Sequence, residues 1–150
     1  MSETDLAQEE ALSLISMEKH RIDDQVWIYS GLGCSLSIPL ISADKKEEFL
    51  LDMSLGRINL TKRTYQNRAR KSIILVRLDL GGPNHLNPDG EDIPSPHLHI
   101  YREGYGNKWA FPLPMDGFLD INDPQKLLDD FMVFCHITQP PIIEGDLFNG

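Results

Sequence analysis

Runs in which apolar and polar residues alternate, separated by short turns, fill the middle of this 150-residue sequence. In the clearest run, residues 72–80, every second side chain from Ile74 to Leu80 is apolar. Successive side chains of a β-strand point to opposite faces of its sheet, so such a run has one apolar face to bury. Most connections are too short for a crossover helix, which favours antiparallel neighbours. The pattern therefore predicts an antiparallel sheet that meanders through the chain.

The remaining elements complete an α+β prediction for a single domain spanning residues 1–150. A helix is expected near each end, over residues 3–21 and 124–137, where apolar residues recur with helical spacing. Asp123 is a suitable N-cap for the second helix, and Pro124 suits its first turn. Between the helices we expect one meandering antiparallel sheet of about six or seven strands, at residues 26–30, 34–41, 48–55, 57–64, 72–80, 97–101 and 109–113.

The composition is that of an ordinary globular protein, with 41% hydrophobic and 25% charged residues. No apolar run approaches the roughly 20 residues that span a bilayer, so we expect no membrane association. The acidic N-terminal segment lacks the basic region of a signal peptide. We therefore expect a cytoplasmic protein in which both cysteines, Cys34 and Cys135, are reduced.

Charge is distributed unevenly along the chain. The formal net charge is −9, yet residues 57–77, the basic strip, hold seven basic and no acidic side chains. A local cationic strip can bind phosphate at close range even in an acidic protein, and Tyr65 within it could stack on a base. We predict nucleic-acid contacts from Arg57, Lys62, Arg63, Arg68, Arg70 and Lys71. The alternative is that the basic strip neutralises acidic parts of the same protein.

Residues 81–109 contain three of the five histidines together with a dense set of turn residues. Glycine and proline leave little room for a regular element in residues 81–96. A connection this long within a compact domain is often functional. The sequence does not reveal its path, and therefore does not show whether His85 approaches the other two histidines.

The strand expected after this connection carries the candidate chemistry. Alternation places His97, His99 and Tyr101 on one face, and Arg77 would join them if residues 72–80 form the neighbouring strand. Histidine as base and acid, with arginine stabilising the phosphorane charge, suits metal-independent RNA cleavage. We therefore predict His97, His99, Tyr101 and Arg77 as catalytic residues. Histidines beside proline-rich loops also serve structural roles by binding loop carbonyls, and that alternative stays open.

A metal site is another alternative for the same segment. Suitable ligand atoms come from His85, Asp89, Glu91, His97 and His99. Their spacing matches no familiar zinc pattern, and residues 87–92 lack the ligand ladder of a calcium loop. The sequence also lacks a P-loop, a dinucleotide-binding glycine motif and a nucleophile elbow. We accordingly expect neither a metal nor an organic cofactor.

Three segments carry a resemblance to a known family. They read GRINLTKRTYQNRAR at 56–70, LVRLDLGGPNHLNPDGEDI at 75–93 and PHLHIYREGYGNKWAFPL at 96–113. In these segments the chain resembles an uncharacterised family of small bacterial and prophage proteins. The resemblance implies a setting among phage, plasmid or toxin–antitoxin genes, and it implies no activity for any residue.

Two functions follow as expectations. The first is a mobile-element protein that binds or acts on nucleic acid, in its enzymatic form a metal-independent, toxin-like ribonuclease with RNA as its partner. The second is a non-catalytic interaction protein, such as a phage inhibitor or an antitoxin-like partner, whose acidic surface binds another protein. The oligomeric state is not predicted.

Overall fold

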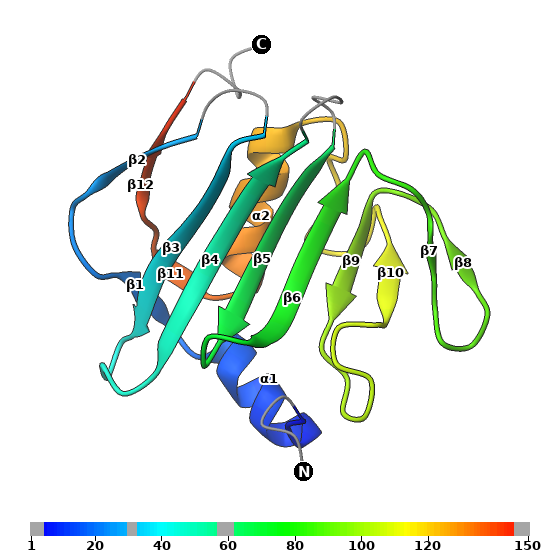
Figure 1. Ribbon diagram of the computed structural model, residues 1–150, viewed down its shortest axis with the longest axis horizontal. Coiled ribbons are helices and arrows are strands. Elements are labelled where there is room, and N and C mark those ends of the chain that lie inside the picture. Colours follow the sequence, from blue (N-terminus) through cyan, green and yellow to red (C-terminus); the bar gives the residue numbers. More distant parts are fainter. Residues whose placement is uncertain (1–4, 30–32, 57–61, 146–150) are drawn as a thin grey trace.

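A computed structural model describes residues 5–29, 33–56 and 62–145 (Figure 1). Its main sheet has eight strands in the order β10-β9-β6-β5-β4-β3-β1-β11. The strands are β1 (Lys19–Arg21), β3 (Ser35–Ser42), β4 (Glu48–Leu55), β5 (Arg63–Ala69), β6 (Ile73–Leu80), β9 (His97–Ile100), β10 (Ala110–Pro112) and β11 (Ile137–Gln139). All neighbours are antiparallel except β1 and β11. The α+β class is confirmed, but six or seven strands was too low, because three-residue strands such as β1 and β11 are too short to give an alternating pattern.

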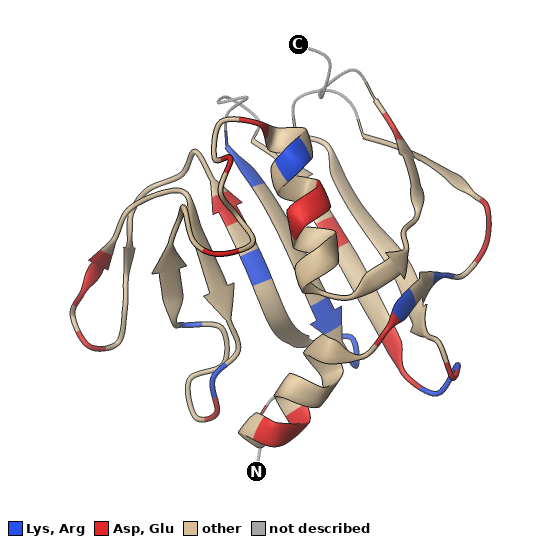
Figure 2. Cartoon of the chain, turned by 180° about the vertical axis from the view of Figure 1, so that it is seen from behind, with Lys and Arg blue, Asp and Glu red and all other residues tan. Residues whose placement is uncertain are grey.

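Both helices lie on one face of this sheet (Figures 1 and 2). They are α1 (Gln8–Ser16) and α2 (Pro124–Phe134). The second helix begins as predicted, since the Asp123 side chain accepts hydrogen bonds from two backbone N–H groups of its first turn. Both predicted ranges were too long at the C-terminal end, and the first helix also begins later than predicted, at Gln8. The residues beyond each helix join the sheet instead, as β1 and β11.

The core lies between the helices and the covered face of the sheet. On β4 every second side chain from Phe49 to Leu55 is buried. On β5 the buried positions are Tyr65, Asn67 and Ala69. Tyr65 packs near Phe131 of α2, with 6.4 Å between ring centroids. The intervening side chains of these strands therefore belong to the uncovered face.

The strand β5 starts later in the basic strip than predicted. A strand was expected at 57–64, whereas β5 runs from Arg63 to Ala69. Residues 57–61 lie outside the described part of the chain. From the sequence, no element was assigned to residues 65–71. Pairing with the long strands β4 and β6 makes residues 65–69 part of β5.

Lys19 connects the C-terminal ends of the two helices. Its side chain is fully buried, and its Nζ donates to the carbonyl oxygens of Ile15 (2.9 Å), Met17 (2.9 Å) and Cys135 (2.7 Å). The same nitrogen lies 4.6 Å from the centroid of the Phe49 ring. Burial lowers the pKa of Lys19 to about 8. The three carbonyl oxygens use all three donors of the ammonium group, so this buried lysine has a structural role.

Residues 81–96 fold back beside the β10 edge of the main sheet (Figure 1). They contain a small hairpin of β7 (His85–Leu86) and β8 (Asp92–Ile93), where no regular element was expected. Asn87 fixes this hairpin, because its side-chain amide donates to the Ala110 carbonyl (3.0 Å) and accepts from the Ala110 N–H (2.9 Å). The segment is therefore anchored to the sheet.

A separate two-stranded parallel sheet consists of β2 (Val26–Ile28) and β12 (Ile142–Glu144). It lies beyond β3 in Figure 1, at the side of the molecule opposite the β7–β8 hairpin. Among the described residues, no helix has both the length and the apolar character needed to cross a membrane.

Candidate functional site

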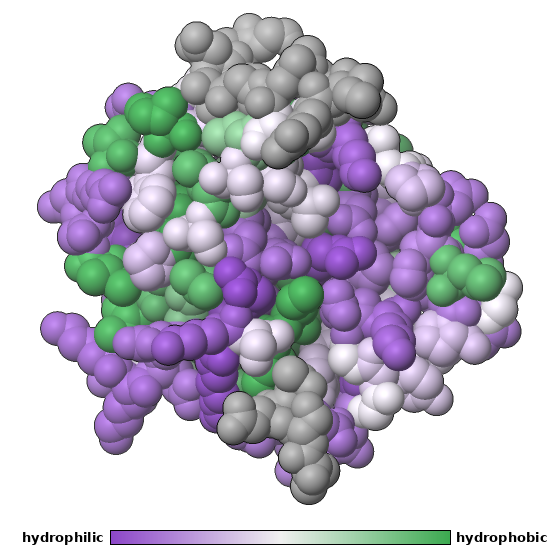
Figure 3. All heavy atoms as spheres, in the orientation of Figure 1, coloured by the Kyte–Doolittle hydropathy of each residue, from purple (hydrophilic) through white to green (hydrophobic). Residues whose placement is uncertain are grey.

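The face of the main sheet without helices is polar, and strand pairing arranges its side chains in two rows. The first row consists of Ser37, Asp52, Gln66, Arg77 and His99. The second row consists of Ser35, Ser54, Thr64, Asp79 and His97. Figure 3 shows hydrophilic side chains across the middle of this face. Every residue in both rows has a side chain that can form hydrogen bonds.

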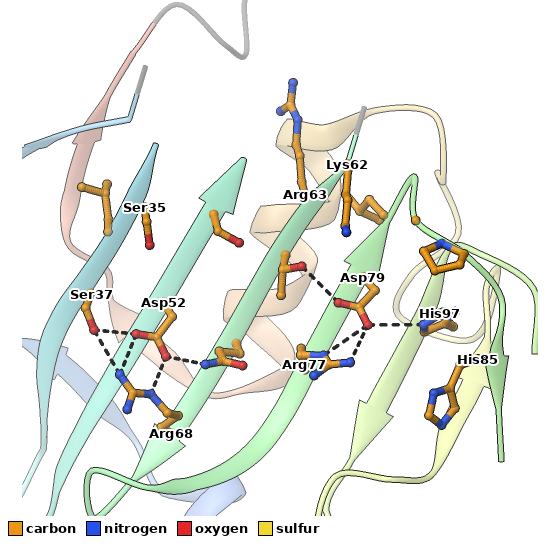
Figure 4. A pocket seen from close by; sticks show the side chains of 17 residues that line it. Ser35, Ser37, Asp52, Lys62, Arg63, Arg68, Arg77, Asp79, His85 and His97 are labelled. Atoms are coloured by element: carbon orange, nitrogen blue, oxygen red, sulfur yellow. Dashed lines mark hydrogen bonds and ion pairs between the residues drawn. The ribbon is translucent and has the colours of Figure 1, made fainter. Parts of the chain in front are cut away.

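A cleft of about 660 Å³ opens along these rows (Figure 4). Ser35 and Ser37 line one end, and Gly82, Pro83 and His85 line the other. Its charged lining consists of the basic Lys62, Arg63, Arg68 and Arg77 and the acidic Asp52 and Asp79. The cleft therefore has a net positive formal charge, although the chain as a whole is strongly acidic.

The carboxylate of Asp79 is the centre of one cluster in the cleft. Its Oδ2 lies 3.0 Å from His99 Nε2 and 3.3 Å from His97 Nε2. The same oxygen accepts from Arg77 Nε (3.1 Å) and Nη2 (2.9 Å), and Oδ1 accepts from the Thr64 hydroxyl (3.2 Å). Burial alone would raise the pKa of Asp79, but hydrogen bonding to His97 and His99 and the adjacent Arg77 guanidinium hold that pKa well below its usual range. Asp79 is therefore a carboxylate at neutral pH.

Backbone carbonyl oxygens fix the orientation of His97 and His99 through the ring nitrogen that points away from Asp79. Nδ1 of His97 lies 3.2 Å from the Pro94 oxygen, and Nδ1 of His99 lies 2.8 Å from the Asn107 oxygen. A carbonyl oxygen only accepts, so Nδ1 carries a proton in both rings. Both side chains are buried, and all four ring nitrogens face oxygen atoms of the protein. For either ring to act as a base or an acid on a substrate, one of these contacts must break.

His85 is the third imidazole of this cluster. Its ring centroid lies 4.6 Å from that of His99 and 5.9 Å from that of His97. Its Nε2 lies 2.7 Å from the Lys108 carbonyl oxygen, which places the proton on Nε2. His85 was not among the predicted site residues. No local signal could have located it, because its position depends on the path of residues 81–96.

Tyr101 does not belong to this cluster, contrary to the prediction. β9 ends at Ile100, and the buried Tyr101 side chain extends to the segment before α1. There its hydroxyl donates to the Leu6 carbonyl (3.1 Å) and accepts from the Leu6 N–H (2.5 Å). The prediction assumed that strand alternation continues to residue 101, whereas the chain leaves the sheet one residue earlier.

Asp52 is the centre of a second cluster in the cleft. Arg68 binds it with two hydrogen bonds, from Nε to Oδ2 (2.5 Å) and from Nη2 to Oδ1 (2.9 Å). Ser37 donates to the same carboxylate at 2.5 Å and Gln66 at 2.8 Å. These contacts join β3, β4 and β5 on the uncovered face. Arg68, predicted to bind nucleic acid, is therefore neutralised by a carboxylate of the same protein.

Arg70 is neutralised in the same way, outside the cleft. Its guanidinium forms ion pairs with Glu10 of α1 (2.8 Å) and with Glu47 (3.0 Å). The hydrogen bonds that Arg70 donates to Glu47 and Glu10 raise its pKa. Both Arg68 and Arg70 thus follow the alternative in which the basic strip balances acidic parts of the protein.

The other predicted nucleic-acid contacts divide between the cleft and the surface. Lys62 is exposed and lines the cleft. Arg63 lies at its rim, and its side chain points away from Arg77 (Figure 4). Lys71 is exposed in the turn between β5 and β6, outside the cleft. Arg57 falls on residues outside the described part of the chain.

Within the described residues, Asp79, His97 and His99 form a group that could hold a metal ion. Their ligand atoms all lie within 4.8 Å of one another. Asp89 and Glu91, considered with the histidines from the sequence, are exposed in the turn of the β7–β8 hairpin instead. The Asp89 carboxylate there accepts from the Glu91 backbone N–H at 3.0 Å.

Comparison with known families supplies a classification. A family model described as "Family of unknown function (DUF6978)" matches residues 6–137. The chain belongs to this family. No curated protein and no solved structure matches it. The resemblance to an uncharacterised family is confirmed, and all three sequence segments lie within the matched residues, whereas the mobile-element setting stays a prediction.

The matched DUF6978 region contains both carboxylate clusters and the whole described lining of the cleft. In chemical terms the cleft offers hydroxyl and amide groups along its floor, one exposed lysine, and the imidazoles of His85 and His97 at one end, with the buried His99 beside them. Such a site can bind an anion through hydrogen bonds and charge, and it can hold a cation at Asp79.

Proposed function

We propose that the cleft binds the phosphate backbone of a single-stranded nucleic acid, with RNA as the first candidate. The observation that carries the proposal is the excess of basic over acidic side chains in the lining of a cleft on an acidic protein. Acidic surfaces elsewhere repel a polyanion, so attraction is confined to this face. A volume of about 660 Å³ lies within the range of ordinary ligand sites and suits one or two nucleotides.

Contacts with phosphate would come mainly from Lys62 and from the hydrogen-bond donors of the two rows. Lys62 is exposed, whereas Arg68 and Arg77 share their charge with Asp52 and Asp79. Each neutralised arginine contributes less long-range attraction than an unpaired one. We therefore expect modest affinity that weakens steeply as the salt concentration rises.

The enzymatic form of this proposal, metal-independent RNA cleavage by His97 and His99 with Arg77, stays a prediction. It requires one ring nitrogen to lose its contact with a protein oxygen and to contact a substrate atom instead. A role in a mobile element is likewise part of the proposal and rests only on the resemblance read from the sequence.

The test is binding of a fluorescently labelled single-stranded RNA, measured by anisotropy at several salt concentrations. For single strands, log K falls by about 0.7 per log unit of salt for each phosphate contact. Lys62→Ala should lower the affinity several-fold and reduce the slope by about that amount. Lys126→Ala is the matched control, because Lys126 is an exposed lysine on α2, on the opposite side of the sheet.

Two results would contradict the proposal. One is an RNA affinity that does not change with salt. The other is an equal loss of affinity in Lys62→Ala and Lys126→Ala, which would mean that net charge and not the cleft is responsible. Inspection of labelled RNA after incubation, for wild type and for His97→Ala, tests the cleavage prediction in the same samples.

A second candidate function is binding of a basic protein partner through the helix-bearing side. The pairing of Arg68 and Arg70 with the protein's own acids favours it, since it removes two cations from the basic strip. Figure 2 shows acidic residues on both helices and in the adjoining connections. The helices also expose Leu12 and Val133, whose side chains are 51% and 76% accessible. A partner with basic and apolar groups would complement this surface.

This candidate makes a separate prediction. Glu9→Lys with Asp129→Lys, one change on each helix, should abolish capture of such a partner and leave RNA affinity unchanged or higher. Retained capture by this double variant would exclude the helix-bearing side as the interface.

A further inference from the structure

We propose that Asp79, His97 and His99 bind one divalent transition-metal ion, most suitably zinc, at the histidine end of the cleft. This inference goes beyond nucleic-acid binding and does not depend on it. It rests on the geometry of three side chains from two neighbouring strands, β6 and β9.

The first argument is the direction of the ring lone pairs. The carbonyl oxygens of Pro94 and Asn107 fix the proton of each neutral ring on Nδ1. The lone pair of each neutral ring is then on Nε2, and both Nε2 atoms point at the Asp79 carboxylate. Lone pairs do not attract a carboxylate oxygen, so a positive species must lie between them. At His99 the Arg77 guanidinium already supplies positive charge, because its Nη2 lies 3.3 Å from Nε2. At His97 the positive species is either an extra proton on the ring or a metal ion.

The second argument is distance. Ligand atoms that lie 2.0–2.1 Å from a tetrahedral ion are about 3.3–3.4 Å apart. The Oδ2 atom of Asp79 is 3.3 Å from His97 Nε2 and 3.0 Å from His99 Nε2, and all three atoms lie within 4.8 Å of one another. The two distances to Oδ2 are therefore close to those of a tetrahedral site, and binding an ion would also bring the two imidazole nitrogens to a similar separation.

The third argument is the hydrogen bond that the other ring nitrogen of each histidine makes. Histidines that bind metals usually donate their other ring N–H to a carbonyl or carboxylate, which fixes both tautomer and orientation. His97 and His99 both have this arrangement. Two imidazoles and one carboxylate are a ligand set that zinc and other divalent transition metals accept. Asp79 and His97 line the cleft, so the remaining coordination position would open towards it.

The positive charge of Arg77 lowers the metal affinity that we expect for this site. Its Nη2 lies 2.9 Å from Asp79 Oδ2 and 3.3 Å from His99 Nε2, so a metal must share the carboxylate with a guanidinium. Repulsion between the two charges lowers the affinity. Replacing Arg77 by methionine keeps an unbranched apolar stem and removes the charged guanidinium, and so should tighten metal binding by roughly tenfold.

The experiment uses the full chain without a histidine tag, treated with a chelator and then titrated with zinc by calorimetry. Cobalt(II) is added in parallel, because its visible absorption reports four-coordinate binding. We expect one equivalent of zinc. Loss of a residue that only hydrogen-bonds to a metal ligand weakens binding by roughly 10–100-fold. His97→Gln and Asp79→Asn each remove a ligand itself, so each should weaken zinc binding by more than that.

His136→Gln is the matched control, because His136 is exposed at the end of α2, away from the cleft. It should bind zinc as the wild type does. Circular dichroism checks that each variant is folded, and the gain of affinity in Arg77→Met cannot arise from unfolding. Absence of stoichiometric binding by folded wild type, unchanged binding in His97→Gln and Asp79→Asn, or no gain in Arg77→Met would each overturn the proposal.

Discussion

Asp52→Asn is the substitution that separates the two roles open to the basic strip. In the wild type, Asp52 receives two hydrogen bonds from Arg68 and one each from Ser37 and Gln66. Asparagine keeps the shape of the side chain but removes its charge and one of its two acceptor oxygens. Arg68 is then left on the cleft floor without its counter-ion.

The size of the effect follows from the burial of the pair. The Arg68 and Asp52 side chains are 26% and 18% exposed. Exposed ion pairs contribute about 0.2–1 kcal/mol, while removing one partner of a buried pair costs about 3–5 kcal/mol. This pair lies between the two cases, so we expect the free energy of unfolding to fall by about 2–3 kcal/mol at neutral pH. For a domain of this length, that corresponds to a decrease in Tm of about 4–12 °C.

The effect should depend on pH in one direction. Burial alone would raise the pKa of Asp52, but hydrogen bonds from Arg68, Ser37 and Gln66 hold that pKa below its ordinary value. A carboxyl whose pKa is lower in the folded state contributes stability above its unfolded pKa of about 3.9, and that contribution is lost as the pH falls towards the folded pKa. The difference between wild type and Asp52→Asn should therefore be constant above about pH 5 and shrink below about pH 4.

The assay is urea denaturation at a series of pH values, with EDTA present so that bound metal does not contribute. Asp24→Asn is the matched control, because it makes the same change in the exposed pair of Asp24 with Arg21. That control should lose less than about 1 kcal/mol. An equal loss in the two variants, or a difference that grows at low pH, would refute the reasoning. If Arg68 is released into the cleft, Asp52→Asn should also bind RNA more tightly, in spite of its lower stability.

Three further predictions concern the parts that hold the site in place. Lys19→Met leaves three carbonyl oxygens without their partner, two of them buried, and should lower the free energy of unfolding by about 3–5 kcal/mol in urea denaturation. Asn87→Ala leaves both backbone groups of Ala110 unpaired, so we expect a loss of about 2 kcal/mol and earlier proteolytic cleavage within residues 81–96; cleavage at the wild-type rate would contradict this. Burial raises the pKa of the Cys135 thiol to about 12, so a thiol reagent at mildly alkaline pH should label Cys34 alone in the native protein and both cysteines in urea.

The histidine end of the cleft could be predicted because strand alternation is a local property of the sequence. His97 and His99 are two residues apart, as are Arg77 and Asp79, so each pair occupies one face of its strand. One assumption beyond alternation was needed, namely that the two strands are neighbours. The antiparallel register of β6 and β9 places Arg77 opposite His99 and Asp79 opposite His97.

The parts that the sequence did not reveal depend on contacts between distant residues. The Tyr101 side chain binds the backbone of Leu6, 95 positions away in the chain. His85 reaches the other histidines because its own contact with Lys108 and those of Asn87 with Ala110 hold residues 81–96 against the sheet. Ion pairing of Arg70 with Glu10 also needs the position of α1 against the sheet. Neither periodicity nor residue type carries information about such contacts, since they arise from packing of the whole domain.

The two carboxylates of the cleft also limit how strongly it can attract a polyanion. Asp52 and Asp79 allow Arg68 and Arg77 to share one sheet face without strong mutual repulsion, but each pairing removes a cation from the long-range field. A divalent ion at Asp79 would restore positive charge at the histidine end without releasing Arg68. Metal and phosphate would then bind at the same end of one cleft, and each should strengthen binding of the other by the same factor, because binding free energies are reciprocally linked.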